Sequence, residues 1–183
     1  MRRHDNAGVS LVELMIVLVL AGILMSVAMP SYTDTIRRQR LRAATADLVA
    51  AIDLTRSQAI ARGSRVTMAP LDATASWQQG WAVFVDDNGN HQLDAGELLL
   101  YRHDPLADGM SISSVFTSGA AQPYLAYNAG GRACSASNSL AARWGTLTLE
   151  YGENTRNIKI NMLGRVRVCD PARDGSSCSN ASD

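Results

Sequence analysis

The longest apolar run of the chain lies near its N-terminus. From Val9 to Met29 the sequence reads VSLVELMIVLVLAGILMSVAM, in which Glu13 is the one charged residue. A helix of that length rises about 30 Å, enough to cross the hydrocarbon core of a bilayer. A cleaved secretory signal has a shorter apolar region, with its cleavage site behind that region. The pattern therefore predicts a transmembrane helix over residues 9–29, preceded by a polar segment over residues 1–8.

A second helical pattern follows, with a narrower apolar stripe. Small and apolar residues recur three and four positions apart, and mainly Arg, Asp, Gln and Thr stand between them. The stripe consists of Leu41, Ala44, Leu48, Ala51, Ile52, Thr55 and Ala59. We expect the helix to stop at Gly63, because glycine readily adopts the left-handed conformation that ends many helices. The pattern thus predicts one helix from residue 9 to about Arg62, with an amphipathic stem over residues 30–62.

The pattern after Gly63 is typical of β-strands. Short runs rich in apolar and β-branched residues are separated by Gly, Asp, Asn and Pro. They cover residues 65–68, 80–85, 98–102, 111–116, 124–127, 146–151, 157–161 and 165–168. Such spacing indicates antiparallel sheets or a small sandwich. We therefore predict an α+β fold, in which the stem helix packs on a β-rich domain over residues 63–168, followed by a polar tail over residues 169–183.

Composition and charge narrow the possible functions. The chain has 183 residues, and 17 Lys+Arg balance 17 Asp+Glu, so a globally basic nucleic-acid-binding protein is a poor description. A hydrophobic fraction of 46% and a charged fraction of 19% exclude wholesale disorder. The three histidines lack the spacing of metal ligands, and the sequence contains no Gly-x-Ser-x-Gly, Walker loop or dinucleotide fingerprint. We expect no enzymatic activity.

Glu13 is unusual within the apolar run. A carboxylate in a membrane helix costs about 2.5–3.5 kcal/mol at the centre and less near the interface, so such residues usually have a partner. A free N-terminal amine on Val9 would be such a partner for Glu13. It would lie one helical turn from Glu13 in the same chain, or it would belong to a neighbouring subunit. That amine exists only if the chain is cut after Gly8.

These residues resemble a known processing signal. The Arg-rich leader, Gly8 and the run VSLVE (residues 9–13) are similar to the class III signal of type IV pilins and type II secretion pseudopilins. The resemblance implies that a prepilin peptidase cuts after Gly8 and methylates Val9. It also implies that Glu13 pairs with an N-terminal amine during assembly with other pilin or pseudopilin subunits. One departure is Val9, where most members of the family have Phe.

The resemblance also implies a location. Arginines lie on both sides of the predicted span, and those at residues 37–42 alone would favour the opposite orientation. In the family the N-terminus is cytoplasmic, the span crosses the inner membrane once and the C-terminal domain is periplasmic. We therefore expect an inner-membrane protein with a type IV pilin-like fold that reaches the tip of a pilus or pseudopilus after assembly.

Two further segments resemble one branch of that family. The stretch LTRSQAIARG (residues 54–63), followed by Val66 and Thr67, is similar to a segment of the GspH/FimT branch, and so is the segment from Trp81 to Leu99. That branch contains minor pilins of type IV pili and minor pseudopilins of secretion systems. The resemblance implies a FimT-like minor pilin that joins or primes a pilus. The alternative is a GspH-type pseudopilin with a purely structural role at the tip.

A polar segment within the β-rich region has the ligand spacing of a calcium loop. Oxygen-bearing side chains occupy positions one, three, five, nine and twelve of a twelve-residue stretch. They are Asp86, Asn88, Asn90, Asp94 and Glu97. Position six, where glycine allows the sharp turn, is His91. The alternative is a polar hairpin loop, in which Asp, Asn and Gly serve the turn geometry. We expect no cofactor other than this calcium ion.

The second candidate site is a short arginine motif. The sequence GRVR begins at Gly164, and in an extended segment Arg165 and Arg167 point to the same face, with Arg156 and Lys159 near them in sequence. Guanidinium groups suit phosphate oxygens. The motif resembles the GRxR motif of FimT-type minor pilins, which bind DNA at a pilus tip during natural transformation. The resemblance implies sequence-independent, salt-sensitive binding of double-stranded DNA, and the alternative is a plain turn followed by a strand.

The third candidate is a disulfide bond, which a periplasmic location permits. Cys169 and Cys178 flank a short polar loop, and a bond between them would be worth roughly 2–3 kcal/mol. Cys134 paired with either of them is the alternative. The sequence does not choose among these pairings, and one thiol stays free in each.

Overall fold

The computed structural model describes residues 10–72, 76–117 and 123–179, without the side chains of residues 26–31. The chain divides into two compact units, residues 1–37 and residues 38–183, which are described separately below. Gly8 and Val9, the predicted processing residues, lie outside the described residues.

The first unit contains the beginning of helix α1, which spans Leu11–Arg62. Its large apolar side chains from Leu11 to Met25 are exposed, with Leu11 at 76% and Leu24 at 71%. Glu13 is also exposed, and its backbone N–H donates to Ser10 Oγ over 3.2 Å in the first turn. Within the described part of the chain, no helix is both long enough and apolar enough to span a membrane. Exposed apolar surface on this scale usually marks an interaction site.

The second half of α1 belongs to the second unit. Every residue of the predicted apolar stripe is buried, so this prediction is confirmed. The hydroxyl of Thr55 is accommodated in the core because it donates to the carbonyl of Ala51, one turn earlier, over 2.7 Å. The helix ends at Arg62, and Gly63 follows with a φ of 63°, in the left-handed region that the sequence predicted for the stop.

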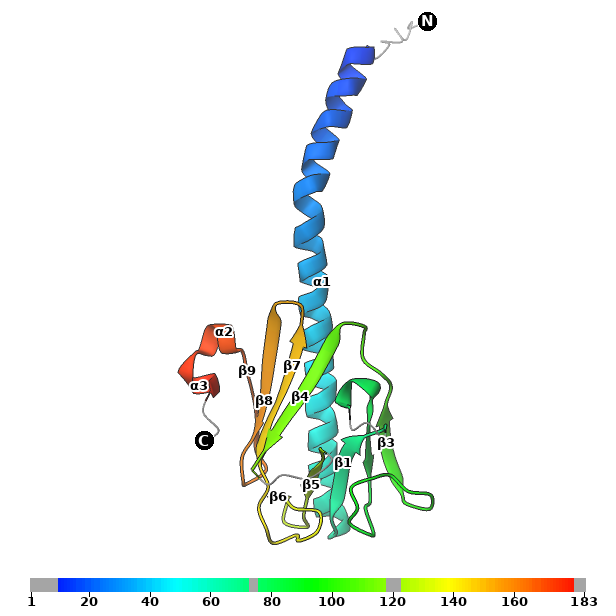
Figure 1. The fold of residues 1–183 in the computed structure, drawn as a ribbon, viewed down its shortest axis with the longest axis vertical. Helices are drawn as coiled ribbons and strands as arrows, with labels where there is room; N and C mark the ends of the chain where they lie inside the picture. The colour runs from blue at the N-terminus through cyan, green and yellow to red at the C-terminus, as the bar shows by residue number, and fades with distance from the viewer. Residues whose placement is uncertain (1–9, 73–75, 118–122, 180–183) are drawn as a thin grey trace, which may run out of the picture. The chain divides into compact units, whose positions relative to one another are not determined.

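Two antiparallel sheets make up the rest of the second unit (Figure 1). The first has the order β3-β2-β1-β5-β6 and the second has the order β4-β7-β8-β9. The first sheet consists of β1 (Val66–Pro70), β2 (Trp81–Phe84), β3 (Leu99–His103), β5 (Leu125–Tyr127) and β6 (Ala133–Cys134), with a 3-10 turn η1 at Trp77–Gln79. The second sheet consists of β4 (Met110–Phe116), β7 (Gly145–Tyr151), β8 (Asn154–Ile160) and β9 (Val166–Cys169).

A single large core joins α1 to both sheets. Leu48 and Ile52 of the helix share it with Val83 of the first sheet and with Leu147 and Ile158 of the second, all of them fully buried. Figure 1 shows both sheets lying along this half of the helix. The predicted α+β fold, with a long N-terminal helix packed on antiparallel sheets, is confirmed.

The stem helix shares its core with the β-rich region. The helix from Arg38 onward is part of the same compact unit as the sheets. The reason is that the buried stripe begins at Leu41. Residues 38–183 therefore have their own core, as an independently folding domain does.

The predicted polar tail over residues 169–183 contains helical turns among its described residues. Two short helices, α2 (Pro171–Asp174) and α3 (Ser176–Ser179), follow β9. Asp170 caps α2 by accepting from the backbone N–H of Ala172 over 3.0 Å, and Pro171 occupies the first helical position, where its missing N–H costs nothing.

Candidate functional site

The predicted arginine motif lies on the β8–β9 hairpin. The side chain of Asn161 organises the turn, because its Oδ1 accepts from the backbone N–H groups of Leu163 (3.0 Å) and Arg165 (2.9 Å). The backbone N–H of Gly164 donates to the carbonyl of Asn161 over 2.9 Å, and the ladder resumes at Val166. The turn therefore holds Arg165 at the exposed start of β9.

Gly164 has a structural role within this turn. Its φ is 77°, and a Cβ atom there would lie 2.5 Å from the carbonyl oxygen of Gly131 and 2.5 Å from a ring carbon of Tyr127. Its own carbonyl accepts from the Tyr127 hydroxyl and from Arg56 Nη1, both over 3.2 Å. Burial raises the pKa of Tyr127, which keeps the phenol protonated as a donor. Gly164 thus fastens the hairpin to β5 and α1.

Arg167 and Lys159 face each other across the hairpin. They are register partners on β9 and β8, and Arg167 is exposed whereas Lys159 is only 9% exposed. Arg167 Nη2 also donates to the carbonyl of Ser177 in the tail. Like charges directly opposite one another weaken a strand pair.

Arg156 does not join these residues, although the sequence places it nearby. It lies an odd number of positions from Lys159 on β8, so the two side chains point to opposite faces of the sheet. Arg156 shares the face of the buried Ile158, and its Nη1 lies 2.7 Å from Asp170 Oδ2. Only about a sixth of each of these two side chains is exposed, 17% in both cases. The predicted set of DNA-binding residues is therefore divided between two faces.

A disulfide bond closes the tail against the sheet. Cys169 at the end of β9 is bonded to Cys178 in α3, which is one of the pairings that the sequence left open. Cys134 is the free cysteine among the described residues, and burial raises the pKa of its thiol to about 11. The bond holds the tail beside β9, where Ser177 meets Arg167.

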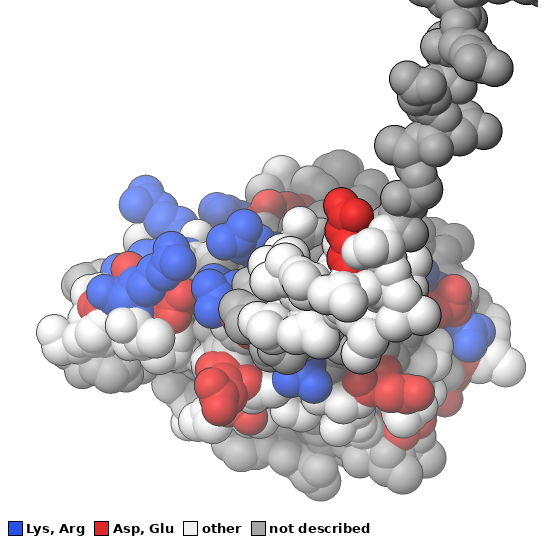
Figure 2. Space-filling model, turned by 90° about the horizontal axis from the view of Figure 1, so that it is seen from above, with Lys and Arg blue, Asp and Glu red and all other residues white. Residues whose placement is uncertain are grey.

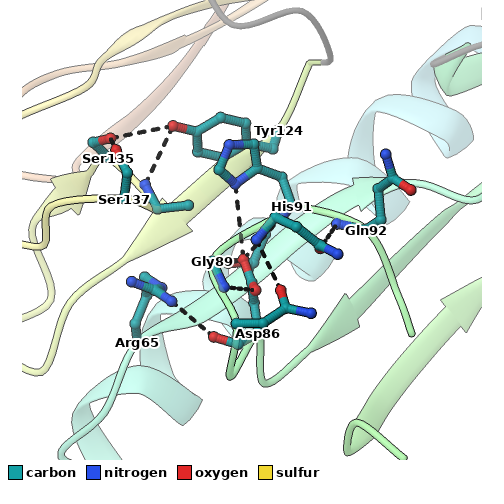
Figure 3. A network of polar contacts seen from close by, with 12 residues as sticks. Arg65, Asp86, Gly89, His91, Gln92, Tyr124, Ser135 and Ser137 are labelled. Carbon is teal, nitrogen blue, oxygen red and sulfur yellow. Dashed lines mark hydrogen bonds and ion pairs between the residues drawn. The ribbon is translucent and has the colours of Figure 1, made fainter. Parts of the chain in front are cut away.

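The predicted calcium loop is organised around Asp86 (Figure 3). This residue is 2% exposed, and its carboxylate accepts from the backbone N–H groups of Gly89 (2.6 Å) and His91 (3.2 Å). Arg65 donates to the Asp86 carbonyl over 2.8 Å. His91, at position six, has a φ of 68°, so the chain makes the sharp turn there without glycine. Asp86 thus serves as the hub of a folded loop.

The other predicted ligands are engaged with one another. The side-chain amide groups of Asn88 and Asn90 donate to Asp94 Oδ2 over 2.7 and 2.6 Å, and the Oδ1 atom of Asn90 accepts from the backbone N–H of Gln92. Glu97 accepts from the backbone N–H of Asp94 over 3.0 Å. Across the described residues, no three His, Cys, Asp or Glu side chains are grouped to hold a metal. Because two amide nitrogens occupy places where oxygens would coordinate an ion, the geometry fits a hydrogen-bonded loop, and calcium binding stays a prediction.

An aromatic stack that anchors this loop was not predicted from the sequence. The His91 ring stacks on Tyr124 with 4.0 Å between ring centroids, and the Arg143 guanidinium lies between the rings of Tyr124 (3.9 Å) and Phe116 (4.2 Å). Arg143 is only 3% exposed. These residues lie far apart in sequence, three of them in loops and Phe116 at the end of β4, so no local spacing could have predicted the contact.

Comparison with known families identifies two regions. The family described as type II transport protein GspH matches residues 44–164, and the prokaryotic N-terminal methylation motif matches residues 3–29. No curated protein matches the chain.

Solved structures share the fold. The type IV minor pilin FimU of Pseudomonas aeruginosa, in its P21 crystal form, has a TM-score of 0.58 at 20% identity, over 77% of this chain and 96% of that chain. Its P65 crystal form has a TM-score of 0.52 at 18% identity, over 75% and 98%. The minor pseudopilin EpsH from the type 2 secretion system of Vibrio cholerae has a TM-score of 0.46 at 12% identity, over 73% and 99%. The first two similarities show the pilin-like fold.

The GspH match covers well over half of the chain, and the methylation motif covers the apolar segment in front of it. The methylation motif agrees with the predicted class III signal, and the GspH match agrees with the architecture of a helix packed on two sheets. The chain belongs to the GspH family of minor type IV pilins and pseudopilins.

Proposed function

We propose that this chain is a minor pilin of a type IV pilus and that it binds double-stranded DNA through Arg165 and Arg167. The observation that carries the proposal is the exposure of both arginines at the start of the edge strand β9, with Arg167 opposite Lys159. Guanidinium groups pair with phosphate oxygens through two parallel hydrogen bonds, without reading the sequence of the bases. Since the chain has no net charge, this local patch supplies the attraction.

The assembly part of the proposal concerns the N-terminal segment. A prepilin peptidase cuts after Gly8 and methylates Val9, and residues 9–29 anchor the subunit in the inner membrane with the C-terminal domain in the periplasm. Glu13 then pairs with an N-terminal amine when the subunit joins other pilins. The match of the methylation motif to residues 3–29 supports this sequence of events. The proposal assigns the chain no catalytic activity.

A structural tip subunit of a type II secretion pseudopilus is the second candidate. The observation that favours it is the packing of Gly164 against Gly131 and Tyr127, which accounts for this glycine without any ligand. The same packing is compatible with DNA binding, because it leaves both arginines exposed.

A DNA titration separates the two candidates. The domain of residues 38–183 is added to labelled double-stranded DNA at about 50 and about 200 mM salt. We expect salt-sensitive binding that the variant Arg165→Ala with Arg167→Ala weakens at least tenfold, with a salt slope lower by about two, one for each lost phosphate contact.

The matched control removes two exposed arginines elsewhere, Arg102→Ala with Arg132→Ala. It has the same net charge as the test variant and should keep the binding of the unmodified domain. Absence of binding at low salt, or an equal loss in both variants, would contradict DNA binding through the hairpin and favour the structural subunit.

A further inference from the structure

A pocket lined by arginines lies within the second unit, among residues of α1, β8 and α2. Arg38 and Arg42 of α1 line this pocket with Arg156 of β8 and Arg173 of α2, together with Glu153 and Asp170. We call it the arginine pocket; its volume is about 150 Å³. Figure 2, which views the molecule from above, shows that Lys and Arg side chains gather on one side of this face.

The charges of the arginine pocket do not cancel. Four guanidinium groups line it against two carboxylates, which leaves an excess of two positive charges. Asp170 orients two of the arginines, since its Oδ2 lies 2.7 Å from Arg156 Nη1 and 3.6 Å from Arg173 Nε. The Arg173 side chain is nevertheless 70% exposed, and Arg42 is exposed as well. The pocket is therefore an accessible site for an anion.

The arginine pocket is separate from the hairpin arginines. Arg156 lies on the face of β8 that carries the core residue Ile158, whereas Lys159 and Arg167 lie on the opposite face. The pocket and the hairpin arginines therefore lie on different faces of the second sheet, and DNA binding through the hairpin does not account for the pocket.

We propose that the arginine pocket binds the phosphate headgroups of an anionic lipid surface. Arg38 follows Met29, the end of the apolar run, by nine residues, which is about 13 Å along an α-helix. Headgroup layers extend several ångströms beyond the hydrocarbon core, and basic residues close to an anionic membrane are attracted to it. The inference rests on the proposed anchoring of residues 9–29, because that anchor holds the domain near the membrane before assembly.

Co-sedimentation with vesicles tests this proposal. The domain of residues 38–183, which lacks the anchor, is mixed with phosphatidylcholine vesicles that contain about one third phosphatidylglycerol, or with pure phosphatidylcholine vesicles. We expect binding to the anionic vesicles alone, at low salt. The variant Arg42→Ala with Arg173→Ala should bind about 25-fold more weakly, which corresponds to roughly fivefold for each arginine near the surface.

Three comparisons make the outcome decisive. Arg42→Lys with Arg173→Lys keeps the charge and should keep vesicle binding, and a thermal melt of each variant shows whether it folds. Arg165→Ala with Arg167→Ala removes as much charge from the hairpin and should leave vesicle binding unchanged. Equal losses in the two alanine pairs, or equal binding to both kinds of vesicle, would overturn the proposal.

The same variants distinguish lipid from DNA and from free phosphate. If Arg42→Ala with Arg173→Ala weakens DNA binding but not vesicle binding, the pocket is a DNA contact and the lipid proposal is wrong. If inorganic phosphate at about 10 mM binds the domain and neither kind of vesicle does, the pocket recognises free phosphate and the commitment to a membrane surface fails. The DNA binding of Arg165→Ala with Arg167→Ala tests only the proposed DNA-binding function and leaves the lipid proposal unaffected.

Discussion

At the scale of single residues, the glycine of the arginine motif is explained by packing. Gly164 combines a positive φ with a close approach to the backbone of Gly131, and backbone cannot move aside as a flexible side chain can. The arginines beside it have no comparable structural constraint, since both are exposed. Within the motif, Gly164 therefore determines the shape of the hairpin, and Arg165 and Arg167 are exposed on its surface.

Gly164→Ala should destabilise the domain markedly. The left-handed conformation costs a non-glycine residue about 1–2 kcal/mol, and the clash with the Gly131 carbonyl adds to this cost. We expect the free energy of unfolding in urea to fall by about 3 kcal/mol. Gly63→Ala is the matched control, because Gly63 also has a positive φ, of 63°, but nothing within 4 Å of the added Cβ. If the two variants lose the same stability, the clash is not responsible.

His91 gives the loop a dependence on pH. Burial lowers its pKa below 6.5, and the nearby cations Arg143 and Arg65 act in the same direction, while Asp86 opposes them. The unfolded chain therefore takes up this proton more readily than the folded one. Above pH 6.5 the imidazole is neutral in both states and contributes nothing to the pH dependence. Stability decreases as the pH falls below that value.

Thermal unfolding of residues 38–183 at pH 7.5, 6.5 and 5.5 checks this prediction. The melting temperature should change little between pH 7.5 and 6.5 and fall between pH 6.5 and 5.5. The fall should be smaller in His91→Asn, since asparagine tolerates a positive φ and does not titrate in this range. An identical fall in the variant would assign the pH dependence to other groups.

At the scale of elements, the tail controls the edge of the second sheet. Strand β9 is an edge strand, and its disulfide holds α2 and α3 beside it. An exposed edge strand can pair with another chain, and a loop or helix that covers the edge prevents such pairing. The tail thus lies beside the strand that carries Arg167 and contacts that side chain through Ser177.

Reduction of the disulfide should loosen this arrangement. Opening so short a loop removes about 2–3 kcal/mol in the chain-entropy description. We expect dithiothreitol to lower the free energy of unfolding by that amount in the unmodified domain. It should have no effect on Cys169→Ser with Cys178→Ser, because Cys134 has no disulfide partner to lose. A stability that dithiothreitol does not change would show that the bond contributes nothing to folding.

At the scale of the whole molecule, the sequence predicted the elements that rest on local periodicity. The apolar stripe of α1 and its stop at Gly63 are in place because helical spacing alone places residues on one face. Strands β1, β2 and β4 were found within one or two residues. The two-residue strand β6 was missed, because it is too short to alternate, and α2 and α3 were missed, because a few polar residues carry no periodicity.

The candidate sites were harder to predict, for a related reason. The alternation of side chains along a strand predicted that Arg165 and Arg167 share a face. The preceding strand was predicted to begin at residue 157, so the sequence did not assign Arg156 to a face, whereas β8 begins at Asn154. The spacing of oxygen-bearing residues over Asp86–Glu97 matched a calcium loop. The hydrogen bonds that these side chains make with one another depend on side-chain orientation, which spacing does not show. The arginine pocket joins residues more than a hundred positions apart, so it emerges only from the packing of α1 against β8 and α2.

The burial of Lys159 has a practical consequence. It is the one lysine of the chain, and it is 9% exposed in the middle of a sheet. A protease that cuts after lysine therefore has a single target, which stays closed while the domain is folded and opens when it unfolds. Cleavage separates residues 38–159 from a short C-terminal piece that keeps both cysteines of the disulfide. One gel band thus reports the fraction of unfolded molecules, without a dye or an engineered tag.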